Sequence, residues 1–381
     1  MEELTLAAKK KNKRKMKAGD FFFFVLVMGL VIFGVIMVFS ASYYTSISET
    51  GNPYAYLKSD LMWAVLGLIV MLFLTVFDYR IYYRFAPWIL GISLFLLVLL
   101  LIPHVGLERN GAVRWLGVEG FPITIMPGEF AKIFAIIFVA WFLAKDPSRI
   151  RSFKRGILPL MALCGVYFAL IIKQPNLSTA LTICMIIVGI MFVAGLRWIY
   201  LGGMAGLGIA GILFMILTDE KGYRMKRLLS FQDPFADPQG TGWQVIQSLY
   251  ALGTGGLTGV GLGKSIQKTL YLPEPQNDFI FAIIGEELGY VGCLLLILAY
   301  VVLIWRCIHI ALNAPDMFSM LLASGITIMI GVQVLMNIAV ATSSMPPTGV
   351  TLPFVSYGGN ALLLFMGSAG IMLNISRHSS V

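Results

Sequence analysis

Charged residues are scarce in this chain. Asp, Glu, Lys and Arg make up 12% of its 381 residues, whereas hydrophobic residues make up 58%. An average soluble domain has roughly 25% charged residues, and these cover its water-exposed surface. The composition therefore excludes an ordinary soluble enzyme and predicts a protein that is surrounded by an apolar solvent.

Cysteine and histidine are also scarce, with four and three residues. The cysteines fall within or at the end of apolar segments and lack the paired spacing of a metal site. We therefore expect four free thiols that pack as small hydrophobic side chains. The scattered histidines argue against a His-based metal site or a catalytic triad.

Long apolar runs, in contrast, are frequent. The run 21–40 carries no charge and is long enough to cross a hydrocarbon layer roughly 30 Å thick as a helix. Similar segments follow at 61–77, 86–103, 126–144, 157–173, 178–194, 198–217, 279–305, 318–342 and 357–376. We predict an all-α polytopic membrane protein with about ten transmembrane helices.

The basic residues predict its orientation. Residues 1–20 form a basic tail, and the apolar run that follows exceeds the roughly 7 to 15 residues of a signal peptide, so we expect a retained anchor. With this tail inside, 17 of the 28 Lys and Arg residues lie on the cytoplasmic side, as the positive-inside rule requires. We predict cytoplasmic termini, a single membrane domain over 21–377, a short tail at 378–381, and a long extracytoplasmic loop at 218–278 between helices seven and eight.

The net charge of +9 could instead indicate a nucleic-acid partner. In the predicted topology, however, the cytoplasmic side carries a charge of +11 and the outer side is neutral. The basic balance thus reflects orientation in the membrane, and we expect no nucleic-acid partner.

Function should lie where ionisable residues enter the membrane or where a loop is longer than a connection requires. Glu129 and Lys132 are three residues apart on one face of a predicted helix, so they can pair. Because each ion costs on the order of 2.5 to 3.5 kcal/mol in lipid, the pair should face the bundle interior. It is either a structural ion pair or one that also lines a polar cavity.

Three further acids lie near the end of the long loop. Glu286 and Glu287 are about two turns inside the helix predicted from residue 279 and point about 100° apart, so at most one should face any single partner. They either brace neighbouring helices or tune a site. Asp278 lies at the mouth of the same helix, where an Asp is either a helix N-cap or a catalyst.

The long loop also contains glycines and cations. Residues 253–265 read GTGGLTGVGLGKS, but Thr258 stands where a phosphate-binding P-loop requires Gly, so the match fails. The stretch is either a flexible loop with a solvated Lys264 or a segment that approaches a ligand closely, with Lys264 serving a phosphate. Arg114 and Arg224 add positive charge on the same side, either for an anionic ligand or as anchors at lipid headgroups.

Several of these residues belong to motifs that occur in order along nearly the whole chain. They are GAVRWL (111–116), PGEFAK (127–132), QPNLSTA (174–180), LPEPQNDFIF (272–281), GEELG (285–289) and PTGVTLPFVSYGG (347–359). In these motifs the sequence resembles the SEDS family of bacteria (shape, elongation, division and sporulation). It is most similar to the division and sporulation branches, FtsW and SpoVE, with the elongation branch RodA as the near alternative. The family usually has other residues at positions 128, 176, 178, 276, 277 and 360.

The resemblance implies a peptidoglycan glycosyltransferase of the bacterial cytoplasmic membrane. Such an enzyme polymerises lipid II on the outer face, releases undecaprenyl pyrophosphate, and works with a class B penicillin-binding protein and other division proteins. Asp278 would be the catalytic base. Arg114, Lys132 and Glu129 by motif, and Arg224 and Lys264 by position, would bind substrate or pyrophosphate. Structural or site-tuning roles fall to Glu286, Glu287, Ser356, Tyr357, Gly358 and Gly359. No cofactor is certain, although a divalent Mg or Mn ion could meet the pyrophosphate charge.

Two other functions would use the same residues. A transporter that flips lipid II would also need charges inside the membrane, but the polar groups gather at the predicted outer mouth and no inverted repeat is evident. A scaffold that only docks division proteins would leave Asp278 and the Glu129–Lys132 pair unexplained.

Overall fold

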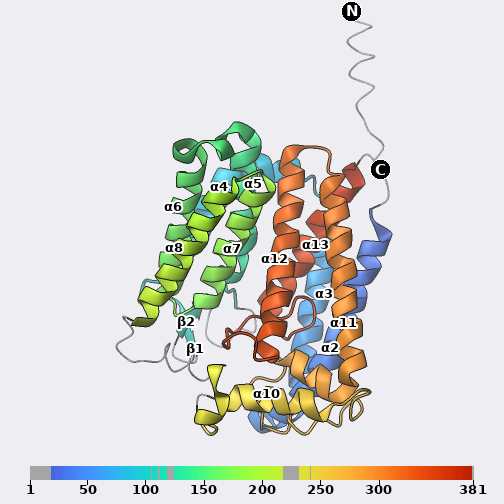
Figure 1. Cartoon of the computed structure of the whole chain (residues 1–381). Coiled ribbons are helices and arrows are strands. Elements are labelled where there is room, and N and C mark those ends of the chain that lie inside the picture. Colours follow the sequence, from blue (N-terminus) through green and yellow to red (C-terminus); the bar gives the residue numbers. More distant parts are fainter. Residues whose placement is uncertain are drawn as a thin grey trace, which may run out of the picture.

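The computed structural model describes residues 19–103, 105–109, 112–117, 124–217, 231–240 and 242–379. Each of the ten predicted apolar segments overlaps a helix (Figure 1): α2 (Phe21–Thr50), α3 (Ala55–Val76), α4 (Arg80–Leu99), α5 (Pro127–Lys145), α6 (Leu158–Ile172), α7 (Leu177–Val193), α8 (Trp198–Leu217), α11 (Ile280–Leu312), α12 (Met317–Ala341) and α13 (Gly359–His378). Among the described residues, eight helical segments are long and apolar enough to cross a membrane, α7 is a shorter apolar helix, and α8 is an apolar helix of 20 residues. The predicted fold class is confirmed, and the chain is a multi-pass membrane protein.

The helices alternate in direction, so both described ends of the chain lie at one end of the bundle, which we call the terminus end (Figure 1). There the backbone N–H of Asp20 donates to Ser376 Oγ (3.0 Å), and Arg306 Nε donates to Asp20 Oδ2 (2.5 Å). The opposite end, across which α10 lies, is called the loop end. The prediction that both termini lie on one side agrees with these contacts between residues near the two described ends.

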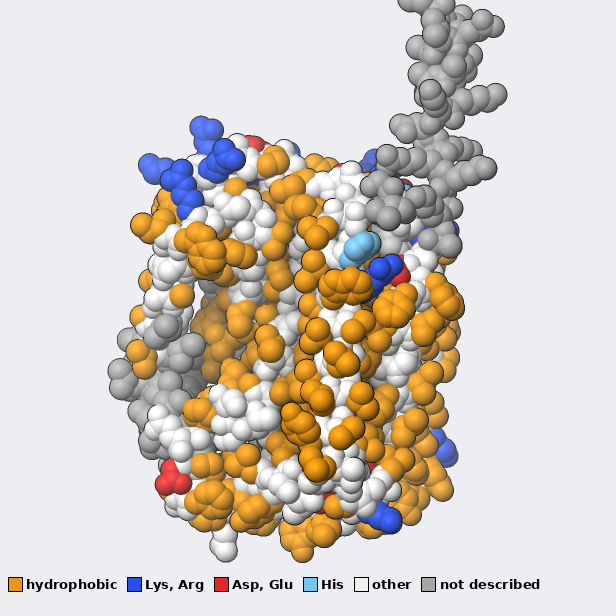
Figure 2. Space-filling model, turned by 45° about the vertical axis from the view of Figure 1, so that its right-hand side comes forward, with side chains coloured by type: hydrophobic (Ala, Val, Ile, Leu, Met, Phe, Trp, Pro, Cys, Tyr) orange, Lys and Arg blue, Asp and Glu red, His pale blue; other side chains and the backbone are white. Residues whose placement is uncertain are grey.

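Most basic residues of the described segments lie at the terminus end. Figure 2 shows a group of Lys and Arg side chains there, above a broad hydrophobic surface. The basic residues at this end are Arg80, Arg84, Lys145, Arg149, Arg151, Lys154, Arg155, Arg197, Arg306 and Arg377. By the positive-inside rule, an excess of Lys and Arg at one end of a helix bundle is typical of the end that faces the cytoplasm.

Helices α12 and α13 form the centre of the bundle and are its most buried apolar helices among the described segments. Helix α3 packs along α13, where Gly67 lies against Met366 and Gly370 lies against the backbone of Met71. Small residues at such contacts allow two membrane helices to approach closely. Helix α8, in contrast, is mostly exposed along its described side chains, and its glycines face open space.

Further short elements connect the helices. At the terminus end, η1 (Pro147–Arg151) and η2 (Phe153–Ile157) join α5 to α6. At the loop end are an antiparallel hairpin of β1 (Leu107–Arg109) and β2 (Ala112–Trp115), the short helix η3 (Pro234–Ala236), and α10 (Trp243–Thr254). Ser248 Oγ donates to the carbonyl of Ala341 (2.7 Å), which fixes α10 to the end of α12. The described part of the predicted long loop is thus folded across the bundle (Figure 1).

Two helices are longer at the loop end than hydropathy predicted. Helix α2 continues ten residues beyond Ser40. Two of the serines in this stretch, Ser42 and Ser46, are buried in the protein rather than exposed to lipid, and the C-cap of the helix is Gly51 with φ of 70°. Helix α3 begins at Ala55, so Asp60 lies inside it, with an exposed fraction of 3%. The predicted topology had placed this acid in an outer loop.

Helix α11 is broken at Gly289, whose φ of 70° only glycine adopts without strain. The carbonyls of Glu286 and Glu287, which lose their helical partners there, accept the N–H groups of Val260 and Gly261 (both 3.0 Å). Beyond the break, the N–H groups of Tyr290 and Val291 donate to carbonyls of residues 256 and 257 (2.9 and 3.1 Å). The glycine-rich stretch therefore approaches a helix backbone and completes the hydrogen bonds of the break.

Candidate active site

Asp278 immediately precedes α11 at the loop end and is half-buried. Its backbone carbonyl accepts from Asn337 Nδ2 (2.9 Å), which also donates to the carbonyl of Val350 (2.8 Å). The side-chain Oδ2 lies 3.4 Å from the position that a Cβ of residue 349 would take, and Gly349 has φ of 71°. The N-cap residue of α11 is Phe279, so the alternative of Asp278 as its N-cap is wrong.

The residues around Asp278 are fixed by the 347–359 motif. Ser356 Oγ donates to the carbonyl of Asn277 (2.7 Å) and accepts the N–H of Leu352 (2.8 Å). The N–H of Tyr357 donates to the carbonyl of Gln276 (2.9 Å). Two segments that are about 80 residues apart in sequence thus hold each other beside the carboxylate.

Hydrogen bonds join the other motifs to this pair of segments. Ser178 Oγ, at the start of α7, donates to the carbonyl of Thr348. Arg114 on β2 donates through Nε to the carbonyl of Gln174 (3.1 Å) and through Nη2 to the carbonyl of Pro175. Arg114 is therefore linked to the Asp278 region through the start of α7.

Asn360, in the first turn of α13, connects this helix to the residues just before α5. Its Nδ2 donates to the carbonyl of Thr124 (2.9 Å), and its Oδ1 accepts the N–H of Met126 (3.1 Å). Gly128, in the first turn of α5, lies against Thr179 of α7. The structure therefore brings the six motifs of the sequence to one end of the bundle.

Glu129 and Lys132 form the predicted ion pair in the first turns of α5. Lys132 Nζ lies 2.9 and 2.8 Å from the two carboxylate oxygens of Glu129. Lys132 is 2% exposed, whereas Glu129 is 12% exposed. The prediction that they pair inside the bundle is confirmed, and the acid is the member of the pair that a ligand can reach.

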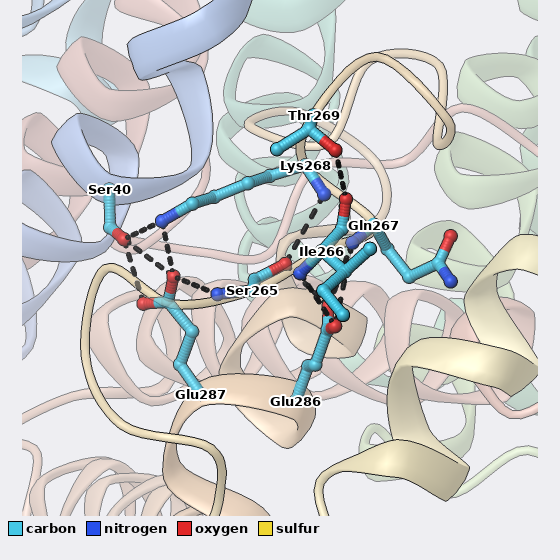
Figure 3. Close-up of polar contacts among 8 residues, drawn as sticks. All are labelled: Ser40, Ser265, Ile266, Gln267, Lys268, Thr269, Glu286 and Glu287. Atoms are coloured by element: carbon cyan, nitrogen blue, oxygen red, sulfur yellow. Dashed lines mark hydrogen bonds and ion pairs between the residues drawn. The ribbon is translucent and has the colours of Figure 1, made fainter.

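Glu286 and Glu287 belong to a second buried group with Ser40, Ser265 and Lys268, which we call the Glu286–Glu287 cluster (Figure 3). Lys268 Nζ lies 2.6 Å from Glu287 Oε1 and donates to Ser40 Oγ (3.0 Å), which in turn donates to Glu287 (2.7 Å). Glu286 accepts the Ser265 hydroxyl and the N–H of Ile266 (2.8 Å).

The two acids share one partner, Ser265, although their 100° separation predicted that at most one of them would face any single partner. The Ser265 hydroxyl bonds Glu286, while the Ser265 N–H lies 3.4 Å from Glu287 Oε1. That expectation is wrong, because the hydroxyl and the N–H of one residue point in different directions. Both acids hold the same stretch of chain, residues 265–268.

The remaining predicted residues are placed as follows. Lys264 is exposed, and Arg224 lies outside the described residues. The Tyr357 hydroxyl lies 3.1 Å from Ser59 Oγ, and its ring packs 5.0 Å from that of Tyr56. Gly358 is the N-cap of α13, and Gly359 begins that helix against the ring of Trp63, where a side chain would not fit.

Sequence reasoning missed three polar residues. Lys268 is 2% exposed, and the signal for it in the sequence is that two buried acids require a nearby cation. Asp60 was missed because its helix begins earlier than the hydropathy suggested. Asn337, which is 1% exposed in the middle of an apolar stretch, was a polar residue at membrane depth and could have been noted.

The segment before Asp278 contains a further acid, Glu274, which accepts a hydrogen bond from Asn277 Nδ2 (2.6 Å). The Glu274 side chain keeps an exposed edge, but the protein atoms packed around it and, second, the nearby carboxyl of Glu49 raise its pKa above the ordinary value. All four cysteines are free, as expected, with Cys184 half-buried and the other three buried.

A family model described as a cell cycle protein, covering FtsW, RodA and SpoVE, matches residues 20–381. The chain belongs to the FtsW/RodA/SpoVE family. The stage V sporulation protein E of Bacillus subtilis (strain 168) is 42% identical to it over 365 residues, which cover 96% of this chain and 99% of that protein. The probable peptidoglycan glycosyltransferase FtsW of Trichlorobacter lovleyi is 39% identical over 357 residues, covering 94% of this chain and 93% of the relative.

Solved structures of the FtsW/RodA/SpoVE family have the same fold. One chain, from a structure described as "Structural coordination of polymerization and crosslinking by a peptidoglycan synthase complex", is 31% identical with a TM-score of 0.78, over 95% of this chain and 98% of that one. The rod shape determining protein RodA of Thermus thermophilus is 28% identical with a TM-score of 0.70, over 96% and 98%. The resemblance inferred from the motifs is therefore confirmed.

Proposed function

We propose that this protein is a membrane peptidoglycan glycosyltransferase that polymerises lipid II at its loop end. The observation that carries the proposal is the position of Asp278, whose half-buried carboxylate lies beside Gly349 in the region that the six motifs share. The FtsW relative of Trichlorobacter lovleyi, a probable peptidoglycan glycosyltransferase that matches nearly the whole chain, supports the same chemistry.

In the proposed step, Asp278 is the general base. Its carboxylate accepts the proton of the 4-hydroxyl of the acceptor GlcNAc, and the hydroxyl oxygen attacks C1 of the donor MurNAc. The bond from C1 to the pyrophosphate oxygen breaks with inversion, and undecaprenyl pyrophosphate leaves with the electron pair. A leaving group of this kind needs charge stabilisation rather than a general acid.

Two partly exposed residues near Asp278 have side-chain oxygens that suit a saccharide ligand. The side-chain oxygens of Asn277 and Thr348 have no hydrogen-bond partner among the described residues. A buried acceptor without a donor costs free energy. Sugar hydroxyl and amide groups are donors that these oxygens can accept.

Arg114 and Lys132 are the proposed cations for the pyrophosphate, since both belong to motif segments that meet near Asp278. Lys132 would act with Glu129, whose exposed edge lets a ligand reach the pair. Lys264 is a candidate by position alone. Among the described residues, no three His, Cys, Asp or Glu side chains are grouped to hold a metal ion. We therefore derive no step through a metal, and an effect of Mg or Mn stays a prediction that removal with EDTA tests.

We further propose that the loop end faces the outside of a bacterial cytoplasmic membrane and that the protein works with a class B penicillin-binding protein. The basic terminus end supports this orientation. The synthase complex that combines polymerization and crosslinking supports a partner of that kind. Membrane lipid and other division proteins are the remaining proposed partners.

The test is glycan synthesis by purified protein with its penicillin-binding partner and labelled lipid II. Because general bases contribute about 10²–10⁴-fold to rates, Asp278→Asn should lower glycan synthesis at least about 100-fold. Asp233→Asn, an equivalent change on an exposed acid beside η3, is the matched control and should leave the rate unchanged. Undiminished polymer from Asp278→Asn would remove Asp278 from this role.

A further inference from the structure

The Glu286–Glu287 cluster joins three parts of the chain that are distant in sequence. Ser40 comes from α2, Ser265 and Lys268 come from the segment before Asp278, and the two acids come from the first turns of α11 (Figure 3). All five residues are buried, and Lys268 and Glu287 are 2% and 0% exposed. A ligand therefore does not reach the cluster, which excludes it as a binding site.

The cluster lies further along α11 than Asp278. Asp278 precedes the first residue of the helix, Ile280, by two residues, and Glu286 lies six residues beyond Ile280, which is roughly 9 Å along the helix at a rise of 1.5 Å per residue. The backbone of residues 268–278 connects the cluster to Asp278.

That backbone is anchored at its two ends and exposed between them. Residues 265–268 are held by the cluster, and residues 276–278 are held by Ser356, Tyr357 and Asn337. Between these anchors, Leu270 and Glu274 are exposed and have positive φ angles of 70° and 51°. Few side chains fix this stretch, although Leu272 is buried and Trp243 Nε1 donates to the carbonyl of Tyr271 (2.7 Å).

We propose that the Glu286–Glu287 cluster, acting through Lys268, is a positioning device that fixes the 265–278 segment and thereby the orientation of the Asp278 carboxylate. This inference rests on the proposed function. The Lys268–Glu287 ion pair attaches the start of the segment to α11, and the end of the segment leads directly into α11 at Asp278. The segment is therefore connected to the same helix at both of its ends. Buried ionic groups often add little stability compared with apolar residues of equal volume, and their best-attested role is to select one arrangement of the chain.

The test uses a double variant, because Lys268→Met alone would leave Glu287 buried without its cation. Lys268→Met/Glu287→Gln removes both charges with side chains of similar size and should keep the melting temperature in detergent close to that of the unchanged protein. Lys154→Met, the same change at an exposed lysine of η2 at the terminus end, is the matched control.

Two readouts separate positioning from mere packing. Hydrogen exchange of the amides in residues 269–278 should become at least about tenfold faster in the double variant and stay unchanged in Lys154→Met. In lipid II polymerisation, kcat should fall about 10–100-fold, as a misplaced catalytic group does, while KM stays within about twofold.

Unchanged exchange would overturn the proposal, and so would faster exchange with an unchanged kcat, because the segment would then move without affecting Asp278. The exchange measurement needs no turnover. If the unchanged protein makes no glycan, the proposed function fails, whereas exchange still decides whether the cluster fixes the segment.

Discussion

Two ion pairs among the described residues have buried lysines, and they are built differently. Glu129 and Lys132 are three residues apart on one helix, and the acid keeps an exposed edge. Glu287 and Lys268 are 19 residues apart. Lys268 lies in the segment before α11 and Glu287 lies in α11, and both side chains are buried. The first pair costs little chain entropy and can meet a ligand, whereas the second orders a loop. In our proposal, the Glu129–Lys132 pair contacts the substrate, and the Glu287–Lys268 pair positions the segment before Asp278.

The largest predicted effect is on stability when either lysine is removed alone. Breaking a buried pair costs on the order of 3–5 kcal/mol, because the remaining charge is uncompensated. Lys268→Met should cost more than Lys132→Met, since Glu287 is fully buried and Glu129 is 12% exposed. Thermal unfolding in detergent, followed by tryptophan fluorescence, gives the ranking. An equal or larger loss for Lys132→Met would mean that exposure does not distinguish the two pairs.

Removing both members of the α5 pair should separate stability from activity. Glu129→Gln/Lys132→Met leaves no uncompensated ion, so most of the stability lost in Lys132→Met should return. If the pair contacts the substrate, kcat/KM for lipid II should still fall about 10–100-fold, the value of a lost hydrogen bond to a charged group. Full recovery of both properties would show that this pair is structural only.

Two serines of α2 offer a smaller and better-matched comparison. Ser40 Oγ bonds both Glu287 and Lys268, whereas Ser42 Oγ, two residues away, is buried and has no partner among the described residues. Ser40→Ala should cost about 1.5–3 kcal/mol, and Ser42→Ala should be neutral or stabilising. Unfolding midpoints of the two variants measure this difference. Equal effects would argue against the arrangement of the Glu286–Glu287 cluster.

The smallest effect concerns Glu274, an acid with amide rather than cationic partners. Because its pKa is raised in the folded protein, its contribution to stability is fully present below its ordinary value of 4.5 and is lost as the pH rises through the raised value. Glu274→Gln keeps an oxygen for Asn277 and should slightly raise the melting temperature at neutral pH but not at pH 4. A difference that is the same at both pH values would contradict this assignment.

The sequence was informative wherever the interaction is local. Ten apolar stretches predicted helices because a membrane helix needs only length and hydrophobicity, and the Glu129–Lys132 pair followed from the spacing on one helix turn. The position of Asp278 at the mouth of α11 was predicted in the same way.

Contacts between distant segments could not be predicted in this way. Nothing in the order of residues indicates that Ser40 meets Lys268, or that Asn360 fixes the entry to α5. The hydrogen bonds between the glycine-rich stretch and the break at Gly289 depend on a fold that brings two backbones together, so a pattern of glycines alone left two alternatives open. Polar residues that face the protein interior also lengthened α2 and α3 beyond their apolar cores.

The most direct test of the central claim is whether the protein makes glycan in detergent micelles, where no membrane separates two sides. Purified protein with its class B penicillin-binding partner and lipid II should produce long glycan chains and release undecaprenyl pyrophosphate. A transporter would produce no polymer in micelles and would move lipid II only in sealed vesicles. Glycan chains are the predicted result, and transport without polymer would contradict the account.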